Sequence, residues 1–140
     1  MTYDAKKDSV KTPRYITNWV RKKFGKFYDP VPYNPHFDRT KHKDALTTEW
    51  KAVNFVNPPY SRAHMFVKKA VEQWKQKKTC VLLVKLDVLG RKFFSDAKGC
   101  EIVFFKERVA FVGHATAPPF NVCLLLYRAG KRSSKYSFFP

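Results

Sequence analysis

The segment between residues 52 and 86 constrains the fold more than any other part of the chain. Its first residues, 52–56, form a short apolar run of the kind found in a buried strand. The run stops at Asn57-Pro58-Pro59-Tyr60, where neither proline can donate a backbone hydrogen bond to a neighbouring strand. The sequence therefore predicts a strand that ends abruptly in a rigid turn.

An amphipathic helix and a second strand are expected after this turn. Ser61 is a candidate helix cap, and apolar side chains then recur at helical spacing, so that they share one face. Residues 79–86 are almost continuously apolar, as in a central strand that is covered on both faces. Strand, helix and strand predict a right-handed βαβ unit. The helical stripe consists of Ala63, Phe66, Val67, Ala70, Val71 and Trp74.

The remaining segments complete the expected domain. Thr12 and Pro13 suit the cap and first position of a helix over residues 13–24, which Gly25 ends. A short helix is expected at 91–97, and strands at 101–105, 109–112 and 120–127. We therefore predict one α/β sandwich over residues 12–128, with a mostly parallel sheet and an antiparallel end. A basic N-terminal arm (1–11) and an exposed basic C-terminal tail (129–140) flank it.

The chain is strongly basic, with 28 Lys and Arg residues against 11 Asp and Glu residues and a net charge of +17. Such a charge attracts polyanions and favours a nucleic-acid partner, although a basic protein packed against acidic neighbours is the alternative. No apolar run approaches the roughly 18 residues of a membrane span. Cys80, Cys100 and Cys123 are widely spaced, and the histidines lack metal-ligand spacing. We expect a soluble, cytoplasmic protein without a metal or a membrane partner.

The Asn57-to-Tyr60 turn suits one particular chemistry. In an open α/β sheet, ligands bind beyond the carboxyl ends of the strands, where this turn stands. An exocyclic base amine is a poor nucleophile, but acceptance of its two hydrogens by the Asn57 side chain and the Pro58 carbonyl would aim its lone pair. Pro58 and Pro59 hold these acceptors in place, and Tyr60 offers a face to a flipped base. The alternative is a rigid turn that merely begins a helix.

This turn resembles the signature of amino-methyltransferases that act on adenine N6 or cytosine N4. The order of the other motifs resembles the small phage-type DNA N6-adenine methyltransferase family, although Ala45 stands where that family has glycine. The resemblance implies a Rossmann-like methyltransferase fold. The matching motifs are Thr12-Pro13, Phe24-Gly25, Asp29, Asp44-Ala45-Leu46 with Trp50, the run from Arg108 to Gly113, and Ala117-Pro118-Pro119-Phe120.

The resemblance also implies a pocket for S-adenosylmethionine. It places Thr12 and Pro13 near the methionine carboxylate, Asp29 near the amino or ribose end, and Asp44 near the adenosine. From the residues alone, Thr12 is equally a helix cap, Asp29 a turn former and Asp44 a solvated loop acid.

Candidate contacts to nucleic acid are Lys22, Lys23, Arg39, Lys41, Lys43, Lys131, Arg132 and Lys135.

Together these features predict an S-adenosylmethionine-dependent methyltransferase acting on adenine N6 in double-stranded DNA, inside a bacterial or virus-infected cell. A second hypothesis is a methyltransferase-like fold with reduced catalysis. It would serve as a basic nucleic-acid-binding or virion structural protein in contact with a viral capsid or the packaged genome. Methylation of RNA or of cytosine N4 is a third, because the turn suits any flipped base that carries an exocyclic amine.

Overall fold

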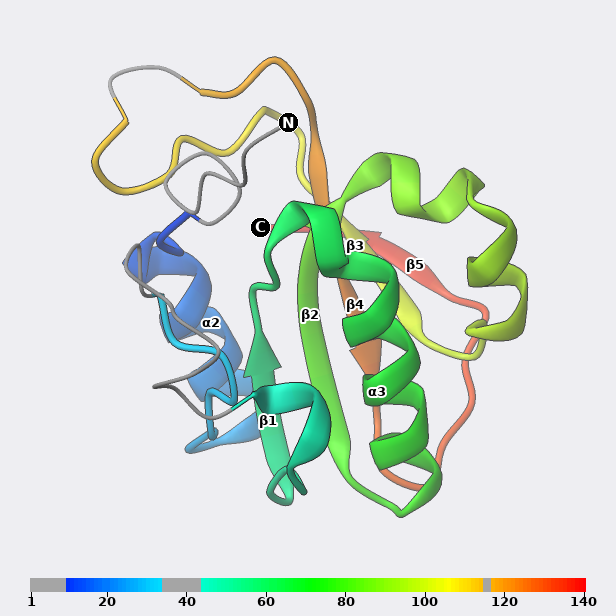
Figure 1. Cartoon of the computed structure of the whole chain (residues 1–140). Helices are drawn as coiled ribbons and strands as arrows, with labels where there is room; N and C mark the ends of the chain where they lie inside the picture. Colours follow the sequence, from blue (N-terminus) through cyan, green and yellow to red (C-terminus); the bar gives the residue numbers. More distant parts are fainter. Residues whose placement is uncertain (1–9, 34–43, 115–116) are drawn as a thin grey trace.

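A computed structural model describes residues 10–33, 44–114 and 117–140. In these segments five strands form one sheet in the order β1-β2-β4-β3-β5, so that β1 and β5 are its edges (Figure 1). Two α-helices accompany the sheet within the described residues. The elements are α2 (Arg14–Phe24), β1 (Val53–Val56), α3 (Ala63–Lys75), β2 (Thr79–Lys85), β3 (Glu101–Phe104), β4 (Val122–Tyr127) and β5 (Tyr136–Phe138).

The two helices cover opposite faces of the sheet. Leu82 and Val84 of β2 pack in one core with the apolar face of α3, whereas Val81 and Leu83 of the same strand pack in a second core with α2. This arrangement follows from the alternation of side chains along a strand, and it explains why β2 is apolar throughout. The predicted α/β sandwich is confirmed.

The strand directions differ from the prediction in one respect. β1 and β2 are parallel, as are β3 and β5, whereas β4 is antiparallel to both of its neighbours, β2 and β3. The antiparallel strand therefore lies in the middle of the described sheet and not at its end. All six residues of β4 are buried, which suits a strand covered on both faces and paired along both edges.

The βαβ segment agrees with the prediction except at the start of its helix. α3 follows β1 and buries Phe66, Val67, Ala70, Val71 and Trp74. Ser61, the expected cap, instead lies within a 3₁₀ helix, η2 (Tyr60–Arg62), and Arg62 is the N-cap of α3 without a capping side-chain hydrogen bond. The two prolines delay the α-helix by one turn, because the 3₁₀ helix begins directly after Pro59.

One further prediction was wrong. Residues 109–112 form no strand, because Val109 and Phe111 are buried in the core on the α2 side and only Val112 makes an isolated bridge, to Lys11. The short helix expected at 91–97 is present as a 3₁₀ helix, η4 (Lys92–Asp96), which follows another 3₁₀ helix, η3 (Leu86–Gly90). The C-terminal tail is largely exposed, and it also contributes β5 to the sheet.

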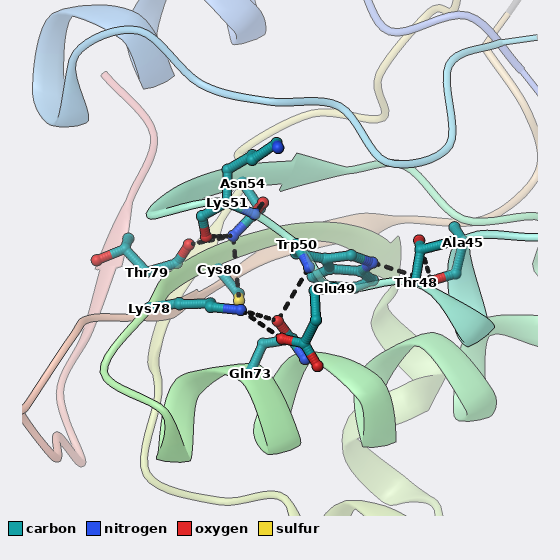
Figure 2. Close-up of polar contacts among 10 residues, drawn as sticks. All are labelled: Ala45, Thr48, Glu49, Trp50, Lys51, Asn54, Gln73, Lys78, Thr79 and Cys80. Carbon is teal, nitrogen blue, oxygen red and sulfur yellow. Dashed lines mark hydrogen bonds and ion pairs between the residues drawn. The ribbon is translucent and has the colours of Figure 1, made fainter.

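Two buried polar side chains, Asn54 and Gln73, hold the segment that leads into β1 (Figure 2). The Gln73 side-chain oxygen accepts from the backbone N–H of Trp50 at 3.1 Å, and the Trp50 indole donates to the Ala45 carbonyl at 3.0 Å. Asn54 donates to the Thr79 carbonyl at 3.2 Å. The first two bonds tie residues 45–50 to α3, and the third ties β1 to β2. The segment that follows Asp44 is therefore held against α3.

The three cysteines are buried and unpaired. Burial raises the pKa of the Cys100 thiol to about 11, so that a reactive thiolate is disfavoured. Within the described residues, no helix has the length and apolar character needed to cross a membrane, and no cluster of metal-binding side chains is found.

Candidate active site

A cavity of about 900 Å³ lies beside the turn that follows β1. Its lining comes from segments that are far apart in the sequence, and it includes three of the four residues predicted to bind the cofactor. Pro13, Pro58 and Tyr60 are not among the lining residues, although each adjoins one. The lining includes Thr12, Asp29, Asp44, Asn57, Arg62 and Val112.

The Asn57 side chain is held in one orientation. Its amide nitrogen donates to the Val10 carbonyl at 2.7 Å and to the Thr12 hydroxyl oxygen at 2.9 Å. Both amide hydrogens are therefore used, and the side-chain oxygen remains as a hydrogen-bond acceptor. Thr12 thus orients Asn57 and does not cap α2, whose N-cap is Pro13 without a capping side-chain bond.

The N-terminal segment reaches Asn57 because a second segment supports it. Lys11 and Val112 form an antiparallel bridge, in which the Val112 N–H donates to the Lys11 carbonyl at 3.2 Å. The neighbouring Phe111 is buried in the core. This arrangement gives a physical reason for the run from Arg108 to Gly113: Phe111 anchors the run, and Val112 pairs with the pocket wall.

Tyr60 and Phe120 form an aromatic pair just beyond the turn. Their ring centroids are 5.2 Å apart and the planes meet at 83°. The Lys85 ammonium lies 4.5 Å from the Tyr60 centroid and 4.3 Å from that of Phe120, a cation–π geometry. The face that Tyr60 was expected to offer to a base is therefore shared with a lysine. Lys85 had a sequence signal that was overlooked, since it is the one charged residue at the end of an apolar strand.

Asp29 lines the same cavity. The segment before it lies parallel to β1, because Tyr28 donates to the Val53 carbonyl at 2.9 Å and accepts from the Phe55 N–H at 3.0 Å. The Asp29 carboxylate accepts from the Val31 N–H at 3.0 Å. Burial nevertheless raises its pKa from 3.8 to about 6, more than this hydrogen bond lowers it. A carboxylate in such a place favours a cationic ligand.

Asp44 is not a freely solvated loop acid. It caps a short 3₁₀ helix, η1 (Ala45–Thr47), by accepting from the Leu46 N–H at 2.9 Å. Its other carboxylate oxygen lies 3.4 Å from an Arg62 guanidinium nitrogen. The sequence did not indicate that Arg62 belongs to the site, because Arg62 follows the turn where a helix was expected to begin.

The candidate nucleic-acid contacts fall into three groups. Lys22 and Lys23 are exposed in the last turn of α2, near the cavity-lining Arg21. Lys131, Arg132 and Lys135 are exposed beside β5, at the sheet edge away from β1. Arg39, Lys41 and Lys43 lie outside the described residues.

Comparison with known proteins adds three findings. Residues 1–122 match the family described as DNA N-6-adenine-methyltransferase (Dam). No curated protein sequence matches the chain. A solved structure, that of a predicted O-methyltransferase, protein Atu636 from Agrobacterium tumefaciens, is similar with a TM-score of 0.40 and 16% sequence identity. The aligned region covers 91% of this chain and 64% of that one, so that the chain spans less than two thirds of its length.

Proposed function

Since the chain belongs to the DNA N-6-adenine-methyltransferase (Dam) family, we propose that it transfers a methyl group from S-adenosylmethionine to the N6 amine of adenine in double-stranded DNA. The observation that carries the proposal is the fixed orientation of Asn57 at the cavity, with both amide hydrogens donated to Val10 and Thr12. A side chain held in this way presents an acceptor and no donor, as an incoming amine requires.

The cavity suits S-adenosylmethionine in size and charge. Ligand pockets usually measure roughly 300–1,000 Å³, and this one measures about 900 Å³. The cofactor carries a cationic amino group, a sulfonium and a carboxylate. Asp29 is the partly buried acid suited to the amino end, and Arg14 and Arg21 also line the cavity, where they suit the carboxylate. When bound, the cofactor supplies an electrophilic methyl group on a sulfonium sulfur.

The residues of the turn then prepare the amine. The Asn57 side-chain oxygen and the Pro58 carbonyl accept its two hydrogens, which draws the nitrogen toward tetrahedral geometry and directs its lone pair at the methyl group. After transfer the nitrogen carries a surplus proton, which passes to water because neither acceptor is a strong base. Tyr60 and Phe120 bound the space beyond the turn, where the flipped base is held.

A labelled-methyl assay tests the proposal directly. Duplex DNA that contains adenine should accept label from S-adenosylmethionine, whereas a duplex in which purine (without the 6-amino group) replaces adenine should not. Calorimetry should detect cofactor binding without DNA. Label found only on cytosine would indicate a cytosine N4 methyltransferase, and label found only on RNA would indicate an RNA methyltransferase. If neither methyl transfer nor cofactor binding were detected, the chain would be better explained as a nucleic-acid-binding protein without catalysis. The comparisons give no support to a viral capsid partner or a virion location.

A further inference from the structure

Three aromatic rings share one exposed face at the edge of the sheet. Tyr136 and Phe138 of β5 are 68% and 57% exposed, and Phe104 of β3 pairs in register with Phe138, on the same face. The Phe104 ring centroid lies 5.8 Å from that of Tyr136 and 5.9 Å from that of Phe138. We call this group the aromatic platform. Exposed aromatic clusters of this kind usually mark a contact surface.

The opposite side of the same edge already anchors β5. Phe139 stacks on Phe105 with centroids 4.9 Å apart, and it also contacts Trp19 of α2 at 5.2 Å. Side chains alternate along a strand, so Phe139 faces the α2 side of the sheet while Tyr136 and Phe138 face away from it. The platform rings are therefore not required to attach the strand.

A basic groove adjoins the platform. A second cavity, of about 410 Å³, is lined by Lys98, Arg132, Ser133 and Ser134, and it also includes Ile102, which pairs with Tyr136. Lysine and arginine with serine hydroxyls form a donor set that suits phosphate oxygens. The run from residue 128 to 138 contains four Lys and Arg residues (Arg128, Lys131, Arg132 and Lys135) and no Asp or Glu.

We propose that the aromatic platform and the basic groove bind single-stranded nucleic acid, with bases stacked on the rings and phosphates in the groove. A charged channel beside exposed aromatics is the arrangement by which proteins bind single strands without reading sequence. A duplex keeps its bases inside the stack, where the rings do not reach them. A second copy of the chain is a poorer occupant, because each copy carries a net charge of +17.

This surface is separate from the cavity at Asn57. β1 and β5 stand at opposite edges of the sheet, four strand spacings apart, which is about 19 Å at the usual spacing of neighbouring strands. Both β1 and β5 run in the same direction, so the Phe138 end of β5 lies toward the same end of the sheet as Asn57. The proposal does not depend on methyl transfer.

Fluorescence anisotropy with labelled oligothymidine tests the proposal. An oligomer of equal length built of abasic nucleotides keeps the phosphates but lacks the bases, and it should bind at least about 5-fold more weakly, since base stacking on an aromatic ring contributes roughly 1–3 kcal/mol. The double variant Tyr136→Leu with Phe138→Leu should lose this difference. Lys98→Gln with Arg132→Gln should weaken both oligomers and reduce the salt dependence.

Controls separate this surface from the rest of the molecule. Met65→Ala alters an exposed apolar side chain of α3 that touches neither the platform nor the groove, and it should bind like the wild type. Duplex methylation by the leucine variant should persist, and its melting temperature shows whether it folds. If it fails to fold, Tyr136→Trp serves instead, because a stacked base quenches indole fluorescence. The proposal would be overturned if the wild type bound normal and abasic oligomers equally well, or if the tryptophan variant showed no quenching. It would also be overturned if the wild type were a dimer that the leucine substitutions dissociate.

Discussion

At the scale of single residues, Asn57 has a structural role and a proposed catalytic role, and the sequence alone does not distinguish them. Its nitrogen holds Val10 and Thr12, and its oxygen is the proposed acceptor for the substrate amine. A variant at this position therefore changes the pocket wall and the chemistry together, and only a comparison of variants distinguishes the two effects.

Asn57→Ala should reduce the rate of methyl transfer by about 100-fold or more, the usual effect of losing one hydrogen-bonding group that acts in the transition state. It should also lower the free energy of unfolding by about 1–2 kcal/mol, because the Val10 carbonyl loses its donor. Thr12→Val removes one acceptor of the same nitrogen and is the matched control. Single-turnover assays and denaturant unfolding measure both effects. An alanine variant with wild-type turnover would show that Asn57 is not catalytic.

Asp29 should make both stability and cofactor binding depend on pH. Its folded-state pKa is about 6, raised by burial from 3.8, so the folded protein binds this proton more tightly than the unfolded chain does. The resulting stability is complete below pH 3.8 and is lost as the pH rises through 6. Melting curves should therefore show Asp29→Asn to be more stable than the wild type above pH 6, by a margin that disappears in acid.

The same carboxylate should govern the cofactor. If it faces the amino group of S-adenosylmethionine, calorimetric affinity should fall as the pH drops through about 6 and Asp29 takes up its proton. Asp29→Asn should bind weakly at every pH. A pH-independent affinity in the wild type would place the amino group elsewhere.

At the scale of elements, the order of strands and helices could be predicted wherever a run had a clear period. The stripe on α3 and the apolar run of β2 belong to this class, since burial on one face or on both is written directly into their residues. The insertion of β4 between β2 and β3 could not be predicted, because pairing partners are chosen by contacts between segments distant in the chain. Val109 and Phe111 look like alternating strand residues, yet they are core residues of a loop.

The candidate site shows the same division. The turn at Asn57 was recognisable from four adjacent residues, and the motif order pointed to Thr12, Asp29 and Asp44, which line one cavity together with Asn57. Their individual contacts were not predictable. Thr12 looked like a helix cap but bonds to Asn57, and Arg62 gave no signal for its pairing with Asp44. Such contacts depend on side-chain directions that spacing does not determine.

A substitution of Gln73 tests whether α3 positions the cavity wall. Gln73→Leu keeps the volume but leaves the Trp50 N–H without its acceptor, which should cost about 1–3 kcal/mol of stability. It should also loosen the segment that carries Asp44, and so weaken cofactor binding. Glu72→Leu, on the exposed side of the same helix, is the control and should change neither. Thermal unfolding and calorimetry provide the measurements. Unaltered cofactor affinity in a destabilised Gln73 variant would uncouple the network from the site.

At the scale of the whole molecule, the net charge of +17 should dominate the binding of double-stranded DNA. Affinity should fall with salt at a logarithmic slope of about −0.9 for each phosphate neutralised. If α2 faces the duplex, Lys22→Gln with Lys23→Gln should make this slope less steep, by up to the amount that about two phosphate contacts contribute. Lys68→Gln with Lys75→Gln, at two exposed positions of α3, removes the same number of charges and is the control. A slope near zero in the wild type would remove the duplex as a partner.

The bridge between Lys11 and Val112 also bears on how the protein becomes competent during its synthesis. The wall that orients Asn57 is made of residues from near the start of the chain, and its support comes from a segment that leaves the ribosome much later. A nascent chain that already contains the complete turn at Asn57 therefore still lacks its support at Val112. Assembly of the pocket wall must therefore wait until residues 108–113 have been synthesised, so that a chain that stops before them should lack the support of the segment that orients Asn57.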